Sequence, residues 1–270
     1  MTGFNWLVCP HCGERLVVEG LVAGCASGHR FDVARQGYLN LLGHAPGANA
    51  DTAAMVEARQ RFLAAGHYSP IRDAVAAVAV AARARAVVEV GAGTGYYLAG
   101  VLDALAGAGV GHAEGLGVDI SPAAARRLAK AHPAARAVVA DVWQGLPLVD
   151  ACADLVACIF APRNAAEFAR VLRPGGRLVT VTPGPGHLAQ ARQAFGLMAV
   201  QDDKDARLVD SLAPQFTRRD RTEVAFGLDL DAATAAALVD MGPNALHEHG
   251  TVTALRVDVE VVVSTWQPAG

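Results

Sequence analysis

"VVEVGAGTGYY", residues 87–97, joins a short apolar run to a loop in which every second residue is glycine. The glycines are Gly91, Gly93 and Gly95. A dinucleotide fingerprint needs its third glycine one position later, where this chain carries Tyr96. Because glycine has no side chain, the loop allows a small ligand to approach the backbone closely. The stretch therefore predicts a buried strand, a ligand-binding loop and the start of a helix.

After this loop, apolar runs alternate with segments of helical spacing. The expected strands lie within residues 86–93, 113–121, 136–141, 153–162 and 177–184. This alternation predicts an α/β fold with a parallel, doubly wound sheet. Residues 251–266 alternate by two and should add one or two edge strands. Residues 186–250 are expected to be mostly helical and to lie on the substrate side.

Two helices are expected before this unit. Asp51 and Thr52 can cap a helix that runs to Ala65. Ser69, followed by Pro70, should begin a second helix that runs to about residue 84. We therefore divide the chain into an N-terminal module of residues 1–45, a helical connector of residues 46–85 and a third domain of residues 86–270.

Two acids end expected strands. Asp119 ends the second, where a carboxylate can bind both ribose hydroxyls, and Asp141 ends the third, where an acid can accept from an adenine amino group. Simpler roles stay open, since Asp119 could only cap the next helix and Asp141 could be a solvated loop residue. With Glu89 before the glycine loop and a Pro-Gly-Gly turn at 174–176, this order is typical of Rossmann-like class I methyltransferases that use S-adenosylmethionine (SAM).

The N-terminal module carries four soft metal ligands. Cys9, Cys12, Cys25 and His29 follow the spacing C-x2-C-x12-C-x3-H, which is usual for a closed, tetrahedral structural zinc site. A thioredoxin-like redox pair is the alternative, but that motif opens a helix, whereas a turn and a strand-like run follow here. Unrelated buried thiols are a third possibility. Cys152 and Cys158, in a distant apolar run, are expected to be core residues.

Bulk composition narrows the class of protein. The 270 residues are 53% hydrophobic and 18% charged, which is typical of a soluble globular protein. The longest apolar run, residues 74–82, is too short to span a bilayer, and the first nine residues do not resemble a signal peptide, so we expect a cytoplasmic protein. The net charge of −3 argues weakly against a nucleic-acid partner. Residues 30–85 carry seven arginines against four acids, a local surplus of three positive charges that GC-rich coding also explains.

The whole pattern resembles the 23S rRNA guanine-N1 methyltransferases, a family that includes tylosin- and mycinamicin-type macrolide resistance enzymes. The resemblance is carried, in order, by "CPHCG" (9–13), "HRFDVARQGYLNLL" (29–42), "EARQRFLAAGHYSPIRD" (57–73), "GAGTGYY" (91–97), "FAP" (160–162) and "TPGPGHL" (182–188). It implies that Tyr68, Gly93, Thr94 and His187 contact SAM and that the cysteine–histidine cluster binds zinc. It also implies a homodimer that acts on an rRNA hairpin near the peptide exit tunnel. Residues 190–270 match only in outline.

The reaction that the resemblance implies is attack of guanine N1 on the methyl group of SAM, with N1 losing its proton. No residue stands out as the base, and the candidates are His67, His187 and Asp141. The acceptor pocket is expected at Phe160, Ala161 and Pro162, which end the fourth strand.

Aromatic and basic side chains suggest how RNA would be held. Tyr96, Tyr97 and Phe160 are candidate stacking platforms for a base turned out of the hairpin, although each could serve only as core packing. Arg30 and Arg35 lie close to the metal ligands in the sequence and could help the zinc module to hold the RNA. Two alternatives stay open: a methyltransferase of a small molecule or protein, and a non-catalytic RNA-binding protein that retains the fold.

Overall fold

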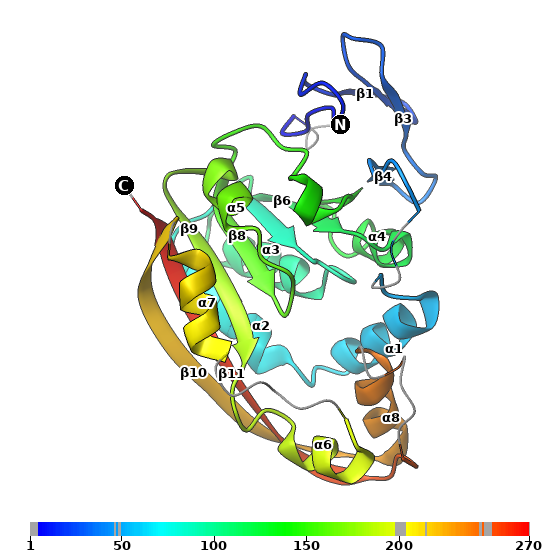
Figure 1. Cartoon of the computed structure of the whole chain (residues 1–270), viewed down its shortest axis with the longest axis vertical. Helices are drawn as coiled ribbons and strands as arrows, with labels where there is room; N and C mark the ends of the chain where they lie inside the picture. The colour runs from blue at the N-terminus through cyan, green and yellow to red at the C-terminus, as the bar shows by residue number, and fades with distance from the viewer. Residues whose placement is uncertain are drawn as a thin grey trace.

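The computed structural model describes residues 5–45, 47, 50–197, 204–213, 215–242, 245 and 250–269. Its centre is an eight-stranded sheet in the order β10-β11-β9-β8-β5-β6-β7-β4 (Figure 1). The strands are β4 (Tyr38–Asn40), β5 (Ala86–Val90), β6 (Glu114–Asp119), β7 (Ala135–Val139), β8 (Ala153–Ile159), β9 (Leu172–Pro183), β10 (Phe216–Leu230) and β11 (Leu255–Pro268). Strands β4 to β9 pair in parallel, and β10 and β11 are antiparallel.

The order of the strands places a ligand crevice at β5. The chain continues from β5 to β6 and β7 on one side, then returns to β8 and β9 on the other. In an open parallel sheet, such a reversal leaves a crevice outside the carboxyl ends of the strands, where ligands bind. The glycine loop of residues 91–95 follows β5 directly and therefore lies at this crevice.

Two apolar cores cover the faces of the sheet, because successive side chains of a strand point to opposite sides. Val87 packs into one core and Val88 into the other. The first core includes residues of α1 (Ala53–Ala64), α2 (Ser69–Ala81), α3 (Tyr96–Gly107), α4 (Pro122–Leu128), α6 (Ala189–Phe195) and α8 (Ala232–Asp240). The second includes α5 (Ala165–Val171), α7 (Lys204–Leu212) and the one-turn helix η1 (Val142–Gln144). Cys152 and Cys158 are buried here, as predicted, and burial raises the pKa of Cys158 to about 12.

The N-terminal module is a three-stranded antiparallel sheet of β1 (Val17–Glu19), β2 (Val22–Gly24) and β3 (Arg30–Asp32), and we call residues 5–33 the ribbon. Figure 1 shows it at the opposite end of the molecule from α6 and α8. Backbone hydrogen bonds tie it to the loop before β8: Val8 N donates to Pro147 O at 2.9 Å, and Val149 N donates to Trp6 O at 2.8 Å. The next strand, β4, belongs to the main sheet, so the predicted first module of residues 1–45 contributes to both units.

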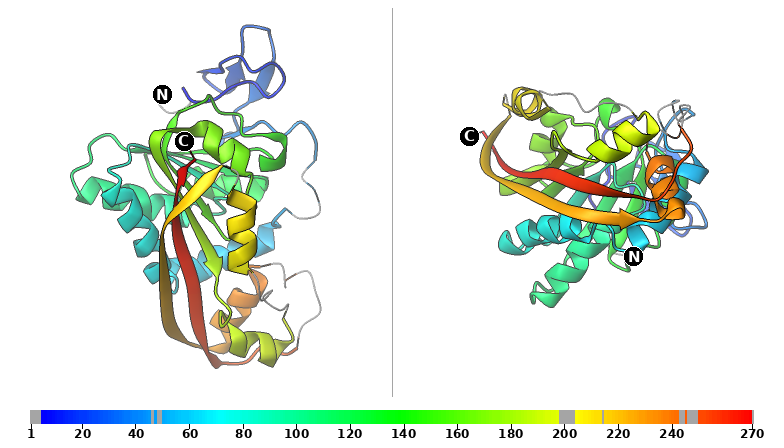
Figure 2. Two further views of the ribbon diagram at one scale, coloured as in Figure 1. Left: turned by 60° about the vertical axis from the view of Figure 1, so that its left-hand side comes forward. Right: turned by 90° about the horizontal axis from the view of Figure 1, so that it is seen from below.

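The prediction that residues 186–250 are mostly helical was wrong, because it missed a long strand. Helices α6, α7 and α8 are present, but β10 is a fifteen-residue strand that pairs with β11 over its length (Figure 2). The strand therefore takes the sheet edge, and β11, expected at the edge, lies between β10 and β9. The charged stretch 218–223 is mostly exposed, which conceals the alternation of residues 224–230. Residues 198–203, 214, 243–244 and 246–249 of this segment lie outside the described part.

The two predicted connector helices are confirmed. Thr52 caps α1 by accepting from Met55 N at 3.3 Å. Helix α2 begins at Ser69 with Pro70 in its first turn, but Tyr68 takes the N-cap position and the helix ends at Ala81. Within the described residues, no helix is both long and apolar enough to cross a membrane.

Candidate active site and metal centre

The glycine loop has the conformation that its sequence predicts. Gly91, Gly93 and Gly95 have φ values of 68°, 54° and 80°, in the left-handed region that favours glycine. Two of them also lack room for a side chain, since a Cβ atom at Gly91 would lie 2.4 Å from Cβ of Ala161, and one at Gly95 would lie 2.6 Å from Cδ1 of Leu128. The loop therefore presents bare backbone to the crevice and packs tightly behind it.

Asp119 holds this loop against β6. Its carboxylate is 9% exposed and accepts from Gly93 N and from Ser121 N, each at 2.8 Å. Burial raises the pKa of Asp119, and the two backbone donors oppose that rise. Each carboxylate oxygen has a further lone pair for a hydroxyl donor. Both predicted roles are thus compatible: Asp119 organises the turn and remains a candidate for the ribose.

Asp141 occupies a different setting. Its carboxylate accepts from Trp143 N at 3.0 Å and caps η1. It is half-buried and does not line the cavity described next. The capping role is therefore present, and the predicted contact with adenine stays a prediction.

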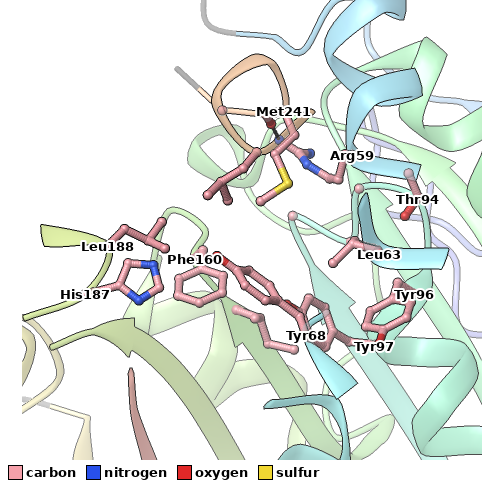
Figure 3. A pocket seen from close by; sticks show the side chains of 16 residues that line it. Arg59, Leu63, Tyr68, Thr94, Tyr96, Tyr97, Phe160, His187, Leu188 and Met241 are labelled. Carbon is pink, nitrogen blue, oxygen red and sulfur yellow. Dashed lines mark hydrogen bonds between the residues drawn. The ribbon is translucent and has the colours of Figure 1, made fainter. Parts of the chain in front are cut away.

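A cavity of about 300 Å³ opens beside the glycine loop. Of the predicted site residues, Tyr68, Gly91, Gly93, Thr94 and His187 line it, together with Tyr96, Tyr97 and Phe160 (Figure 3). His67 does not line it and packs on Phe62 at a ring distance of 4.7 Å. Of the three candidate bases, only His187 is therefore at the cavity.

Aromatic rings form one side of the cavity. The ring of Phe160 lies 6.0 Å from that of His187 and 6.4 Å from that of Tyr68. Tyr68 is buried, and burial raises the pKa of its hydroxyl. Phe160 and Leu188 have φ values of 54° and 55°. Such a conformation is strained for bulky residues and clusters at functional sites.

The predicted acceptor segment divides between two environments. Phe160 faces the cavity and is 42% exposed, whereas Ala161 is buried against Gly91 and Pro162 is exposed. The Cys158 thiol donates to the carbonyl oxygens of Ala161 and Pro162 at 3.4 Å each. The backbone of this segment is therefore held by the buried Cys158 thiol, while the Phe160 ring remains accessible.

Arg59 also lines the cavity, although no sequence pattern predicted a role for it. It lies on α1, pairs with the Asp51 carboxylate and donates through Nη2 to Met241 O at 2.6 Å. Figure 3 shows Arg59 and Met241 together, away from the Phe160 and His187 rings. Only the fold brings these residues together, because Met241 is far away in the sequence.

The metal cluster assembles as its spacing predicts. The Sγ atoms of Cys12 and Cys25 lie 3.6 Å apart, and Nδ1 of His29 lies 3.5 Å from Sγ of Cys9 and 3.4 Å from Sγ of Cys25. Bonds of about 2.3 Å to sulfur and about 2.0 Å to nitrogen give a zinc tetrahedron with edges of roughly 3.5–3.8 Å. The four ligand atoms lie within 4.8 Å of one another, so they fit one structural zinc ion.

The comparisons with known proteins match the two parts of the chain that carry these residues. The family described as "RlmA, N-terminal" matches residues 7–44, and the "Methyltransferase domain" family matches residues 87–176. The "23S rRNA (guanine(748)-N(1))-methyltransferase" of Streptomyces fradiae is 44% identical over 257 residues, which cover 94% of this chain and 90% of the relative. A relative from Micromonospora griseorubida is also 44% identical, over 89% of this chain and 87% of its own length. The chain belongs to the 23S rRNA (guanine-N1)-methyltransferase family.

Membership in this family confirms the predicted fold class, a Rossmann-like SAM-dependent methyltransferase domain with a small N-terminal zinc-binding domain. The YcgJ protein of Bacillus subtilis has the same fold, with a TM-score of 0.50 and 15% identity over 73% of this chain and all of that one. The metal cluster therefore lies within the residues that match the family's N-terminal zinc ribbon, and the glycine loop lies within those that match the methyltransferase domain.

Proposed function

We propose that this protein transfers a methyl group from SAM to N1 of a guanine in a hairpin of 23S rRNA. The observation that carries the proposal is the cavity that joins the glycine loop to the exposed ring of Phe160. The name of the Streptomyces fradiae relative, which specifies guanine N1 of 23S rRNA, supports it further.

The residues at the loop fit SAM. Gly91 and Gly93 offer backbone without side chains, and Asp119 offers carboxylate oxygens beside them for the ribose hydroxyls. When bound, SAM supplies a methyl group on a positively charged sulfur, which already activates it for transfer. The chain then has chiefly to hold the acceptor in line with that group. Asp141, which caps η1, is our candidate partner for the adenine amino group.

We assign the acceptor wall to Phe160 and the base to His187. A guanine that is turned out of its hairpin can stack on the Phe160 ring, and Tyr68 lies on the far side of that ring from His187 (Figure 3). Guanine N1 carries a proton that must leave, and His187 is the candidate base that lines the cavity. An imidazole nitrogen that carries no proton can accept one, which suits that role.

We assign RNA binding to the ribbon and the turn that follows it, with Arg30 in the ribbon and Arg35 in the turn as exposed cations. Guanidinium groups bind phosphate through bidentate hydrogen bonds. An rRNA substrate implies a cytoplasmic enzyme, and we further propose a homodimer. A methyl group on this hairpin would contribute to macrolide resistance, because the hairpin lines the exit tunnel.

The test is a methylation assay on unmethylated 23S rRNA with SAM, followed by reverse transcription. Methyl on guanine N1 blocks the pairing edge, so the polymerase stops beside the modified base. One new stop in the exit-tunnel hairpin, much weaker with the Phe160→Ala variant at the same reaction time, is the expected result. Methyl incorporation without a stop would indicate another atom or substrate. SAM binding without any incorporation would favour a non-catalytic RNA-binding protein.

A further inference from the structure

Arg59 places a positively charged guanidinium group at the cavity. Among the described residues that line it, Arg59 is the sole lysine, arginine, aspartate or glutamate. Its side chain is 24% exposed, and contacts with Asp51 and Met241 fix it between α1 and the end of α8. A cation held in this way is positioned before any ligand arrives.

The guanidinium of Arg59 lies beside the glycine loop. An ideal Cβ atom at Gly93 would lie 3.3 Å from its Nη1 atom, which is tighter than ordinary van der Waals contact, so the guanidinium occupies the space that a side chain at this position would need. The carboxylate of Asp119 contacts the same glycine by accepting a hydrogen bond from Gly93 N. Arg59 also opposes the rise in the pKa of Asp119, whereas Asp51 adds to it. The loop thus lies between a carboxylate and a guanidinium.

Within the described part of the chain, Arg59 keeps further donors beyond its contacts with Asp51 and Met241. A guanidinium has five N–H groups, and among the described residues these contacts use two of them. Asp51, Asp119 and Arg59 together carry a net charge of −1, which suits a cofactor whose net charge is positive. Within that cluster, the guanidinium alone attracts a carboxylate, and its planar fork matches one.

We propose that Arg59 binds the α-carboxylate of SAM. This assignment rests on the proposed methyl transfer and adds the residue that orients the amino-acid arm. SAM bound with its ribose at Asp119 would bring its amino-acid arm within the same cavity, where Arg59 beside Gly93 is the cation among the described lining residues. Within these residues, Arg59 has donors left for the carboxylate of that arm. By fixing the arm, it sets the direction in which the methyl group points.

The experiment compares two ligands on two proteins by calorimetry. The ligands are SAM and its decarboxylated analogue, which differ only in the carboxylate. Arg59→Ala should raise the Kd for SAM about 10- to 100-fold, the range expected for a charged hydrogen-bonded pair. It should change the Kd for the decarboxylated analogue by less than about threefold. Arg59→Lys, which keeps the charge without the fork, should give an intermediate Kd for SAM.

Arg61→Ala is the matched control, because Arg61 is on the same helix but is exposed and outside the cavity. The ratio of the two Kd values decides the test even if Arg59→Ala lowers stability, since unfolded protein reduces both signals alike. Equal weakening of both ligands would overturn the assignment and leave Arg59 as a structural link between α1 and α8. Wild-type protein that does not bind SAM would instead overturn the proposed function itself.

Discussion

Glu89, in the middle of β5, is a buried carboxyl group that should make stability depend on pH. It is 1% exposed, and its Oε2 atom has no hydrogen-bond partner within the described residues. Burial is the main cause that raises its pKa to about 8, and the backbone N–H of Leu98 partly opposes this. The folded protein therefore keeps Glu89 protonated at neutral pH. Glu89→Gln replaces the neutral acid with an amide of the same shape.

The sign follows from where the proton is bound. Folding stability falls with pH wherever the folded state holds more protons than the unfolded chain. Glu89 loses its proton near pH 4.5 when unfolded and near pH 8 when folded. Its cost to stability is absent below pH 4.5, grows as pH rises, and is complete above 8. At about 1.4 kcal/mol per pH unit, the cost reaches roughly 4–5 kcal/mol.

Urea unfolding of the zinc-loaded protein, without SAM, measures this cost. We expect the stability of Glu89→Gln relative to wild type to rise by roughly 3.5–4 kcal/mol between about pH 5 and pH 8.5, the part of the full cost that falls within this range. Other titrating groups cancel in the difference between variants. Glu57→Gln, on the exposed side of α1, is the control and should show no such trend. A difference that stays constant within about 1 kcal/mol across this range would refute the reasoning.

Three further predictions test the metal, the loop and the acceptor wall. Cys25→Ala removes a zinc ligand and should reduce RNA affinity at least about tenfold, while the Kd for SAM stays unchanged. Equal loss of RNA binding and SAM binding would show that the ribbon is needed for the whole fold. Gly91→Ala should lower stability by about 1–3 kcal/mol more than Gly109→Ala, because both have positive φ but only Gly91 would clash with Ala161. Phe160→Asn should be about 1 kcal/mol more stable to unfolding than Phe160→Ala, since Asn tolerates the left-handed conformation. Both variants should methylate RNA roughly 10- to 100-fold more slowly than the wild type. Equal stability of the two variants would show that φ at this position carries no strain.

Local sequence patterns predicted the structural features that are determined by residues close together in the chain. The metal spacing fixes the distances among four ligands, and the glycine loop fixes its own backbone. Both were therefore predictable from residues 9–29 and 87–97 alone. The alternation of strands and helices predicted the parallel sheet for the same reason, because each crossover is a local unit.

Features that depend on distant pairing were not predictable. Strand β10 is stabilised by β11, and its exposed charged residues follow no period that separates a strand from a helix. Arg59 is positioned by Met241, which directly follows α8 and which only the completed fold brings near. The choice among His67, His187 and Asp141 likewise required the cavity, since sequence position does not show which side chain reaches it.

The ribbon and the acceptor wall are joined through one short segment. Arg170, near the end of α5, donates to Leu146 O and Leu148 O at 2.8 and 2.6 Å, in the loop that binds the ribbon. Asn164, which caps the start of α5, donates to Val142 O at 2.9 Å and follows Phe160 by four residues. Helix α5 thus holds the ribbon-binding loop at one end and is capped by Asn164, four residues after Phe160, at the other. On the proposed assignment of RNA binding to the ribbon, this connection would place a bound hairpin at a set distance from the Phe160 ring, which a mobile tether would not achieve.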